Sequence, residues 1–342
     1  MPPLTDTFDR PLRSLRVSVT DRCNLRCGYC MPEADYEWLP KSDLLDFEEM
    51  SRWIGAFSRQ GVDRVRLTGG EPLLRRELPT LIRMIREVAG IRDLAMTTNG
   101  VLLSDQAEAL LAAGLTRVTI SLDTLQPERA RILTGRNQLA RVLAGLDAVS
   151  ELGFESVKWN TVLVRGRNDD EVESLLRAAG ERGAELRFIE YMDVGGATRW
   201  NRDDVVSKAS LLAEIDSIFG EVESVATDAS APARRYRLPN GQVFGIIAST
   251  TEPFCRSCDR ARLTADGQFF TCLYARQGFD LRGAIRSGVT DDELDQMLTG
   301  IWSRRSDRGA EERLALRDAR GPLAGAEELE RDPHLEMHTR GG

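Results

Sequence analysis

The chain contains six cysteines, and they fall into two groups of three. The first group is Cys23-Asn-Leu-Arg-Cys27-Gly-Tyr-Cys30, and the second consists of Cys255, Cys258 and Cys272. A structural zinc ion usually takes four protein ligands, and both histidines, His334 and His338, are remote in sequence from either group. Three thiolates can instead hold a four-iron cluster and leave one iron open to another ligand. We therefore expect an iron–sulfur cluster at each triplet, with zinc completed by an outside ligand as the alternative.

Short β-rich runs alternate with helical patterns through the first two-thirds of the chain, which is typical of βα units that build a parallel sheet. The expected strands are residues 16–20, 64–68, 93–97, 117–121, 157–164 and 185–190. The expected helices are residues 47–60, 78–88, 104–113, 139–152 and 169–182, with Ser104 and Asp169 as N-caps. The first cysteine triplet directly follows the first strand, where such folds carry their chemistry.

Six such units are too few for a closed eight-stranded barrel, so we predict an α/β fold with a partial, open βα barrel. In such barrels ligands lie at the carboxyl ends of the strands. The later periodicity predicts a polar linker at 221–233, a hairpin around Pro239-Asn240-Gly241, a helix at 291–304, and a weaker helix or mobile tail at 305–332. We therefore divide the chain into a barrel, residues 1–220, and a C-terminal region, residues 221–342, which carries the second triplet.

The composition limits the classes of function. The 342 residues carry a net charge of −8, which argues against nucleic-acid binding through a general basic surface. The first residues lack the basic and then apolar pattern of an export signal, and no run is long enough to cross a bilayer. We expect a cytoplasmic protein that binds neither nucleic acid nor membrane.

The first triplet and the segment after the next strand resemble the radical S-adenosylmethionine superfamily. The triplet has the C-x₃-C-x₂-C spacing of that superfamily, and Thr68-Gly69-Gly70-Glu71-Pro72 resembles its segment that meets the methionine amino group. The resemblance implies a [4Fe-4S] cluster whose open iron binds S-adenosylmethionine and whose reduction leads to cleavage of that cofactor. It also implies cofactor contacts at Tyr29, Gly70, Ser121 and Met192.

A second resemblance covers nearly the whole chain from Arg16 onward and is to the molybdenum cofactor biosynthesis protein A family of GTP 3′,8-cyclases. The segments that carry it are Arg16-Val-Ser-Val-Thr-Asp-Arg-Cys23, Thr97-Thr-Asn-Gly100, Ser121-Leu-Asp123, Lys158-Trp-Asn160, Arg187-Phe-Ile-Glu-Tyr-Met192, Phe254-Cys-Arg-Ser-Cys-Asp-Arg-Ala-Arg-Leu-Thr264 and Gly341-Gly342. It implies that Cys255, Cys258 and Cys272 hold a second [4Fe-4S] cluster whose open iron binds the guanine of GTP. The implied GTP contacts are Arg16, Arg66, Thr97, Lys158, Arg260, Ala261 and Arg262.

This resemblance also implies a reaction and a set of partners. A hydrogen atom is taken from C3′ of the GTP ribose, and that carbon then attacks C8 of guanine to give (8S)-3′,8-cyclo-7,8-dihydroguanosine 5′-triphosphate. Gly341 and Gly342 are expected to reach into the active site and to take part in catalysis. The implied partners are an electron donor, a downstream cyclic pyranopterin monophosphate synthase and a second copy of the chain in a homodimer.

Two other functions fit part of the pattern. A peptide-modifying radical S-adenosylmethionine maturase with an auxiliary cluster usually carries more than six cysteines. A non-catalytic electron-transfer protein has no use for the Gly-Gly-Glu-Pro segment or for the set of arginines. Release of 5′-deoxyadenosine, measured with and without GTP, distinguishes the three functions.

Overall fold

A continuous curved sheet forms the framework of the protein, and the computed structural model, which describes residues 4–341, gives it twelve strands. The strand order is β12-β11-β10-β1-β2-β3-β4-β5-β6-β9-β8-β7. The run from β10 to β9 is parallel, and the strands beyond it at each edge are antiparallel. The strands are β1 (Ser14–Ser18), β2 (Arg64–Thr68), β3 (Asp93–Thr98), β4 (Arg117–Ser121), β5 (Ser156–Leu163), β6 (Glu185–Glu190), β7 (Glu223–Val225), β8 (Arg234–Arg237), β9 (Val243–Ile247), β10 (Arg260–Leu263), β11 (Gln268–Phe270) and β12 (Phe279–Asp280).

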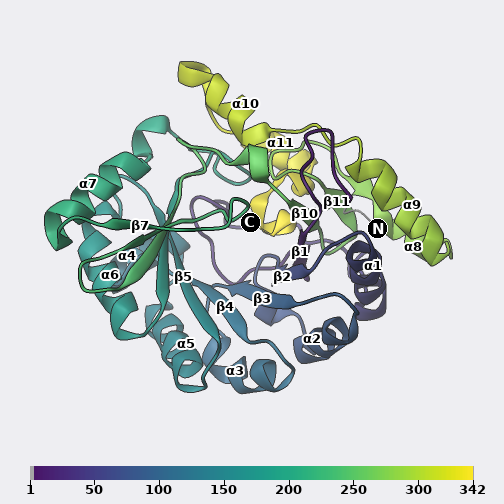
Figure 1. Ribbon diagram of the computed structural model, residues 1–342, viewed down its shortest axis with the longest axis horizontal. Helices are drawn as coiled ribbons and strands as arrows, with labels where there is room; N and C mark the ends of the chain where they lie inside the picture. The colour runs from purple at the N-terminus through teal and green to yellow at the C-terminus, as the bar shows by residue number, and fades with distance from the viewer. Residues whose placement is uncertain (1–3, 342) are drawn as a thin grey trace.

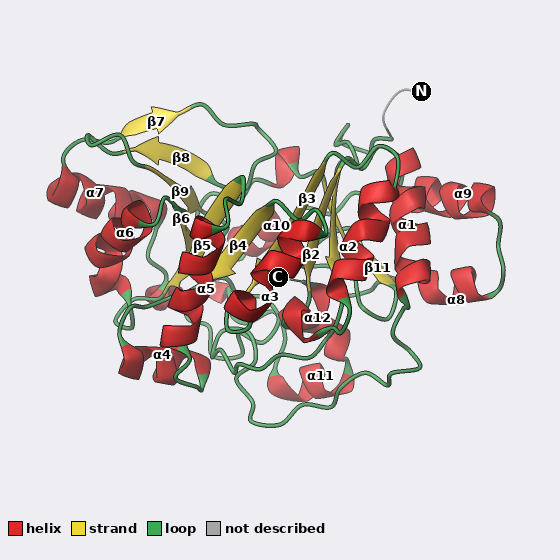
Figure 2. Ribbon diagram, turned by 90° about the horizontal axis from the view of Figure 1, so that it is seen from below, coloured by secondary structure: helices red, strands yellow, loops and turns green. Residues whose placement is uncertain are grey.

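Helices cover the outer face of the parallel strands, and the strands curve around a central space (Figure 1). Seen from below, α8 and α9 lie beside α1 at one end of the molecule (Figure 2). The helices are α1 (Phe47–Arg59), α2 (Leu78–Glu87), α3 (Leu103–Ala112), α4 (Pro127–Thr134), α5 (Leu139–Glu151), α6 (Val172–Glu181), α7 (Lys208–Phe219), α8 (Leu281–Arg286), α9 (Asp291–Trp302), α10 (Gly309–Ala315), α11 (Ala326–Arg331) and α12 (Met337–Arg340). None of the helices within residues 4–341 is long and apolar enough to cross a bilayer.

Alternation along the strands gives the sheet two different faces. In β1, Leu15 and Val17 are fully buried in the hydrophobic core, whereas Arg16 between them lines a cavity inside the curved sheet. The same alternation in β2 places Arg66 on the inner face. Because the strand register pairs Arg16 with Arg66, two guanidinium groups start from neighbouring positions of that inner face.

The structure confirms the partial βα barrel and shifts several predicted bounds. Strands β2, β4 and β6 have the predicted bounds, and β1 begins two residues earlier than predicted, at Ser14. Both predicted N-caps are wrong. The N-cap of α3 is Leu102, so Ser104 lies within the first turn. Residues 169–171 form a separate 3₁₀ turn, and Asp169 Oδ1 accepts a hydrogen bond from the amide of Gly166 (2.7 Å) instead of capping α6.

Residues after 220 extend the same sheet, which local periodicity did not predict. The expected hairpin is present as β8 and β9, and β9 also pairs in parallel with β6. Strand β10 pairs in parallel with β1. The expected linker contains β7, and residues 305–332 contain α10 and α11. The later part of the chain therefore adds one parallel strand at each side of the predicted barrel, while the division at residue 220 stays a prediction.

The two cysteine triplets lie at opposite ends of the parallel strands. Cys23 follows the carboxyl end of β1, whereas Cys258 precedes the amino end of β10, which is parallel to β1. Cys272 follows β11, which runs antiparallel to β10 and so returns to the same end. The expectation that ligands lie at the carboxyl ends therefore holds for the first triplet only, because the second triplet flanks strands that the βα pattern did not include.

Candidate active site

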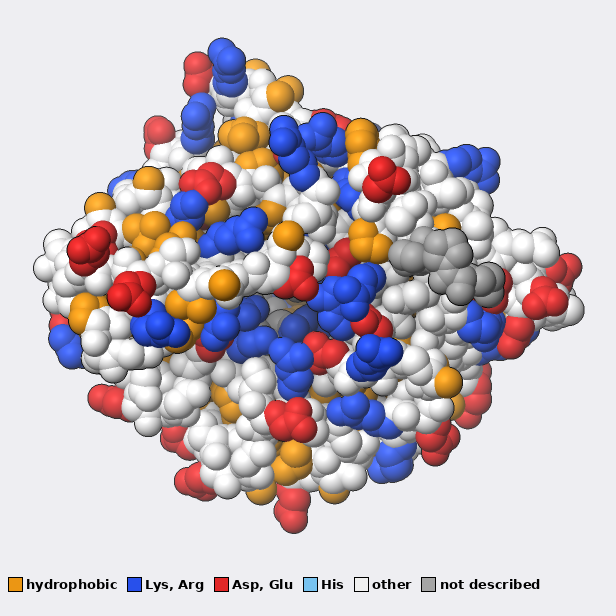
Figure 3. Space-filling model, viewed as in Figure 1, with side chains coloured by type: hydrophobic (Ala, Val, Ile, Leu, Met, Phe, Trp, Pro, Cys, Tyr) orange, Lys and Arg blue, Asp and Glu red, His pale blue; other side chains and the backbone are white. Residues whose placement is uncertain are grey.

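A cavity of about 770 Å³ lies inside the curved sheet, and all six cysteines line it. Lys and Arg side chains gather around the hollow at the centre of the face shown in Figure 3. The predicted cofactor residues that line the cavity are Tyr29, Gly70, Ser121 and Met192, and they lie at or beyond the carboxyl ends of the strands with the first triplet. The structure thus brings both triplets and the predicted cofactor residues to one cavity.

The loop after β2 packs closely against the segment that leads into the first triplet. The amide of Gly70 donates to the carbonyl of Thr20 (2.9 Å). A Cβ at Gly69 would lie 2.3 Å from the carbonyl oxygen of Thr20, and one at Gly70 would lie 2.3 Å from that of Arg22. Glycine is therefore needed at both positions because two backbones approach each other, and this contact supports the loop that carries the first triplet.

Glu71 connects this loop with the loop after β3. Its carboxylate accepts hydrogen bonds from Thr98 Oγ1 (2.7 Å) and from the amide of Asn99 (2.7 Å). Burial raises the pKa of Glu71 to about 7, although these hydrogen bonds favour the ionised form. Asn99 Nδ2 donates to Asn24 Oδ1 (2.7 Å) and lies 3.8 Å from Cys23 Sγ. Two neighbouring strand loops therefore hold the cysteine loop from one side.

Asp123 orients the predicted cofactor residue Tyr29. The hydroxyl of Tyr29 donates to Asp123 Oδ2 (2.7 Å), and the amide of Val162 donates to Asp123 Oδ1 (2.8 Å). Burial raises the pKa of Asp123 to about 6, and the hydrogen bond from Tyr29 counteracts part of that rise. Neither Asp123 nor Asn99 was predicted to support the site. Asn99 directly follows β3 and Asp123 lies two residues after β4. This position at the carboxyl ends of strands was the feature of the sequence that could have indicated their role.

One thiol of the second triplet lies in an electropositive environment. Arg260 Nη2 donates to Cys258 Sγ (3.4 Å). Burial raises the pKa of Cys258, but Arg260 and Arg305 lower it more, so that it falls to about 6. Burial raises the pKa of Cys272 to about 11 and also raises that of Cys255. Cys258 is therefore the thiol of this triplet that is most readily deprotonated.

Both triplets have the donor chemistry of an iron–sulfur cluster site. All six cysteines are free of disulfides. Within residues 4–341 no His, Cys, Asp and Glu side chains converge as tightly as the ligands of a single metal ion. Each triplet places three free thiols on the wall of one cavity. Three thiolates can hold a four-iron cluster, so the residues present fit a cluster held by thiolates.

Positively charged side chains line the middle of the cavity because they occupy alternate positions on the strands. The predicted GTP residues that line it are Arg16, Arg66, Thr97, Lys158, Arg260 and Arg262. Four further arginines line it but were not predicted, namely Arg64, Arg117, Arg187 and Arg235. Side chains two residues apart on a strand share one face, so Arg64 and Arg66 lie on the same face of β2. This alternation could have predicted the further arginines.

The two sets of cations differ in their partners. Arg117 pairs with Asp93 (2.5 Å), and Glu185 pairs with both Arg187 (2.7 Å) and Arg235 (2.9 Å). Arg64 pairs with Asp259. In contrast, no side-chain carboxylate of the described residues forms an ion pair with any of the five predicted cations, which are Arg16, Arg66, Lys158, Arg260 and Arg262. The predicted set is therefore the set of cavity cations without a carboxylate partner among the described residues, and within it only Arg260 lies beside an acidic thiol, that of Cys258.

Burial and the close approach of other cations lower the pKa values of Arg16 and Lys158. Burial, followed by the charges of Arg262 and Arg66, lowers the pKa of Arg16 well below its usual value. Burial, followed by Arg187 and Arg117, lowers the pKa of Lys158 to about 7. A bound polyanion would counteract both the burial and the mutual repulsion of these cations.

The C-terminal segment enters this basic region. The carbonyl oxygen of Gly341 accepts hydrogen bonds from Arg16 Nη1 (3.1 Å) and Arg262 Nη1 (2.9 Å). Gly341 has a φ of +66°, and a Cβ there would lie 2.2 Å from Thr68 Cγ2. Both the backbone conformation and the lack of space therefore require glycine. Gly342, the other residue of the predicted pair, lies outside the described residues.

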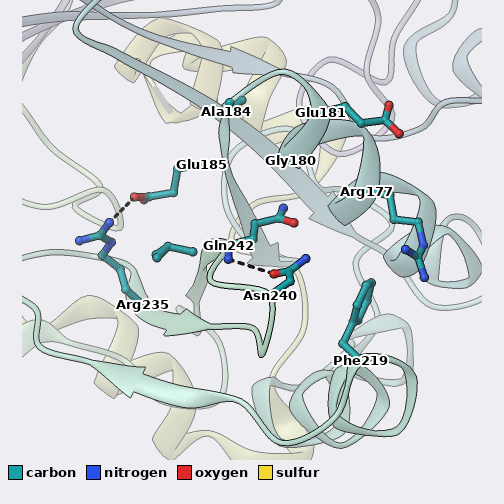
Figure 4. Close-up of a pocket in the computed structure, with 11 residues that line it drawn as sticks. Arg177, Gly180, Glu181, Ala184, Glu185, Phe219, Arg235, Asn240 and Gln242 are labelled. Carbon is teal, nitrogen blue, oxygen red and sulfur yellow. Dashed lines mark hydrogen bonds and ion pairs between the residues drawn. The ribbon is translucent and has the colours of Figure 1, made fainter.

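Two positions lie apart from this arrangement. The side chain of Ala261 is fully buried in the hydrophobic core and does not line the cavity, so a contact with GTP there would have to come from its backbone. A second hollow of about 660 Å³ adjoins the start of β6 and the β8–β9 hairpin (Figure 4). Glu185 and Arg235 line both hollows. None of the predicted site residues lines the second hollow.

Comparisons with known proteins decide the family. Residues 17–179 match the radical SAM superfamily, and residues 184–311 match Molybdenum Cofactor Synthesis C. GTP 3′,8-cyclase 1 of Mycobacterium tuberculosis is 52% identical over 98% of this chain and 95% of its own length. GTP 3′,8-cyclase of Acidothermus cellulolyticus is 48% identical over 96% of this chain and 93% of its own length. The chain belongs to the GTP 3′,8-cyclase family.

Membership of the GTP 3′,8-cyclase family confirms the resemblance drawn from the motifs. A solved structure of Streptococcus suis SuiB bound to S-adenosylmethionine matches with a TM-score of 0.60 and 17% identity, covering 90% of this chain and 68% of that one. At this identity the likeness concerns the fold alone, and it agrees with the partial barrel of parallel strands.

Proposed function

We propose that the protein is a radical S-adenosylmethionine GTP 3′,8-cyclase, which converts GTP to (8S)-3′,8-cyclo-7,8-dihydroguanosine 5′-triphosphate in molybdenum cofactor biosynthesis. Its family and the relatives named above support this activity. The structural observation that carries the proposal is the set of five cations without carboxylate partners in a cavity lined by two cysteine triplets. A nucleoside triphosphate supplies the negative charge that this set lacks.

The residues of the chain have distinct proposed roles. Guanidinium groups bind phosphate through charge-assisted, bidentate hydrogen bonds, which suits Arg16, Arg66, Arg260 and Arg262 to the triphosphate. Lys158 would add a point charge, and Thr97 and the backbone of Ala261 would add polar contacts. Cys23, Cys27 and Cys30 would hold the first [4Fe-4S] cluster, beside S-adenosylmethionine contacts at Tyr29, Gly70, Ser121 and Met192. When bound, the cluster and S-adenosylmethionine supply the radical chemistry, while the protein orients the ribose and excludes water.

We further propose that Cys255, Cys258 and Cys272 hold a second [4Fe-4S] cluster whose open iron binds guanine. The lowered pKa of Cys258 supports this role because thiolates, not thiols, ligate iron. The triplets lie at opposite ends of the strands, and the cations lie on the strands between them. A nucleotide held by its base at the second triplet and by its phosphates on the strands would lie in the same cavity as the first triplet.

The remaining parts of the proposal concern the tail and the partners. Gly341 and Gly342 are proposed to complete the site, supported by the hydrogen bonds from Arg16 and Arg262 to Gly341. The reaction also requires an electron donor, and its product is proposed to pass to a cyclic pyranopterin monophosphate synthase. A cytoplasmic location and a homodimer complete the proposal.

Anaerobic reconstitution followed by measurement of 5′-deoxyadenosine and of cyclised GTP tests the function. The unmodified protein should form both in the presence of GTP. Substitution of Cys23, Cys27 or Cys30 by Ala should abolish S-adenosylmethionine cleavage. Substitution of Cys255, Cys258 or Cys272 should abolish GTP conversion and leave some cofactor cleavage. Full GTP conversion by the latter variants would contradict the second cluster, and lack of product from the unmodified protein would contradict the activity.

A further inference from the structure

Four charged side chains, three of them buried and the fourth, Asp307, half-buried, lie behind the second cysteine triplet. Asp6, Arg10 and Arg305 are 6%, 2% and 4% exposed. Arg10 Nε lies 2.6 Å from Asp6 Oδ2, and Arg305 Nη1 lies 3.5 Å from the same oxygen. Arg305 Nε donates to Asp307 Oδ1 (3.2 Å). The two arginines, one from the segment before β1 and the other from the segment after α9, therefore share one buried acid.

This network contacts the backbone or a neighbour of each cysteine in the triplet. Arg10 Nη1 donates to the carbonyl oxygen of Cys255 (3.0 Å). Arg305 Nη1 donates to the carbonyl oxygen of Cys258 (2.8 Å). Asp307 Oδ2 accepts a hydrogen bond from the hydroxyl of Thr271 (2.8 Å), the residue before Cys272. No other set of side chains described above reaches all three ligand segments.

The positive ends of the network face two of the three cysteines. The guanidinium groups of Arg10 and Arg305 contact the backbone of Cys255 and Cys258, whereas the carboxylate of Asp307 lies on the side of Cys272. Arg10 Nη2 is buried and has no partner among the described residues. Hydrogen bonds and nearby positive charge are two of the means by which a protein stabilises the reduced form of an iron–sulfur cluster.

We infer that Arg10 and Arg305 are positioning residues of the second cluster, which hold the turn from Cys255 to Cys258 and raise the reduction potential of the cluster. This inference rests on the second [4Fe-4S] cluster of the proposed function. It gives a role to the start of the 305–332 stretch, for which sequence reasoning expected only a weak helix or a mobile tail. Arg10 and Arg305 act through the ligand segments and touch neither substrate nor cofactor in this account.

The test uses the full chain with Cys23, Cys27 and Cys30 all replaced by Ser, so that reconstituted iron reports on the second site alone. Arg10→Met, Arg305→Met and Arg305→Lys are added to this parent protein. Arg86→Met is the matched control, because Arg86 Nε also donates to a backbone carbonyl, that of Gly114 (2.8 Å), but lies on α2 outside the cavity lining. Iron content, the midpoint potential from a redox titration followed by electron paramagnetic resonance, and the rate of iron loss to a chelator are measured.

Both Met variants should show a lower midpoint potential, because a positive charge beside the cluster is lost. Iron loss should be about 10- to 100-fold faster, the effect typical of residues that orient metal ligands. Arg305→Lys should keep most of the potential but lose iron faster, because the charge remains while the geometry of the carbonyl contact is lost. The control should match the parent.

Two results would overturn separate parts of the argument. A parent protein that binds no iron would contradict the second cluster itself, and with it the proposed function. A parent protein that binds iron, with Arg variants of unchanged potential and unchanged iron loss, would contradict only the inference about Arg10 and Arg305. If a Met variant does not fold, Arg305→Lys decides alone, since a parental rate of iron loss in that variant overturns the inference.

Discussion

Lys158 is an ionisable group whose charge changes close to neutral pH within the cation set. Its pKa lies at about 7 because burial and three arginines disfavour the ammonium form. Bound triphosphate favours that form, so above pH 7 binding should take up a proton at Lys158. We expect GTP affinity to fall as pH rises from 7 to 9, by at most about tenfold per pH unit.

The measurement is the dissociation constant of GTP between pH 6 and pH 9 for the unmodified protein and for Lys158→Arg. The arginine variant keeps its charge over this range and should show a flatter profile. Protonation of the γ-phosphate affects both proteins equally, so the difference between the profiles reports on residue 158. Parallel profiles would show that Lys158 does not titrate in the binding step.

Gly341 allows a second test at the scale of one residue. Gly341→Ala should displace the tail, because the new Cβ would lie 2.2 Å from Thr68 Cγ2. Formation of cyclised GTP should collapse, while iron content and uncoupled cleavage of S-adenosylmethionine remain. Deletion of Gly341 and Gly342 should have the same effect.

The matched control is Gly288→Ala. Gly288 has a φ of +80°, but a Cβ there would meet no atom within 4 Å. This control carries the same backbone strain, on the order of 1–2 kcal/mol, without the clash. Equal loss of product in both variants would assign the effect to strain and leave the tail without a specific role.

At the level of residues, the sequence predicted which side chains line the cavity better than it predicted the contacts that hold them. The cysteines and Arg16 belong to short motifs, and the structure places all of them on one cavity. Asp123 and Arg10 support that chemistry through contacts with residues far away in the chain. Spacing within a motif carries no information about such partners, so they emerged only from the structure.

At the scale of the element, β10 presents two arginines that differ in their contacts. Arg260 donates to Cys258 Sγ, whereas Arg262 donates to the carbonyls of Arg340 and Gly341. Substitution of either by Ala should weaken GTP binding, because loss of a hydrogen bond to a charged group costs about 1.5–3 kcal/mol, or roughly 10- to 100-fold in affinity.

Equilibrium binding of GTP to the reconstituted variants measures this effect, with iron content as the accompanying control. Both proteins should assemble their clusters, although Arg260→Ala should hold the second cluster less tightly because it also removes a contact with Cys258. Unchanged GTP affinity in both variants would show that Arg260 and Arg262 have a purely structural role.

The predicted helices and strands match the structure where the hydrophobic pattern of a single segment is enough to recognise it. Helices α1 and α5 lie within one residue of their expected bounds, since each needs only its own apolar face to be recognised. The pairing of β9 with β6 and of β10 with β1 depends on strands distant in sequence. The failed caps have different local causes. Asp169 stabilises a turn that does not begin a helix, whereas α3 begins at Leu103, before the polar residue Ser104 that resembles a cap.

At the scale of the whole molecule, the shared sheet predicts cooperative unfolding. A fragment of residues 1–220 would lack β9 and β10 and would leave β6 and β1 as open edges. Open edges with free backbone donors and acceptors promote association, so this fragment should aggregate or unfold at lower denaturant than the full chain.

Urea unfolding of the full chain, followed by circular dichroism and by fluorescence of Trp302 in variants that lack the other tryptophans, tests this expectation. Trp302 lies in the C-terminal region and is fully buried, so its signal reports on that region. The two probes should give one transition with the same midpoint. Separate transitions together with a stable, monomeric fragment 1–220 would establish independent folding units.

The five cations that line the cavity also determine how the protein behaves in solution before a nucleotide binds. A set of buried guanidinium and ammonium groups that lack carboxylate partners acts as an ion exchanger, and the anions of the buffer are its exchangeable counter-ions. Phosphate, pyrophosphate or sulfate carried through a purification would occupy it and protect the fold by mass action. The same anions would then compete with the nucleotide in every assay, so preparations in chloride and in phosphate should differ both in melting temperature and in apparent affinity for GTP.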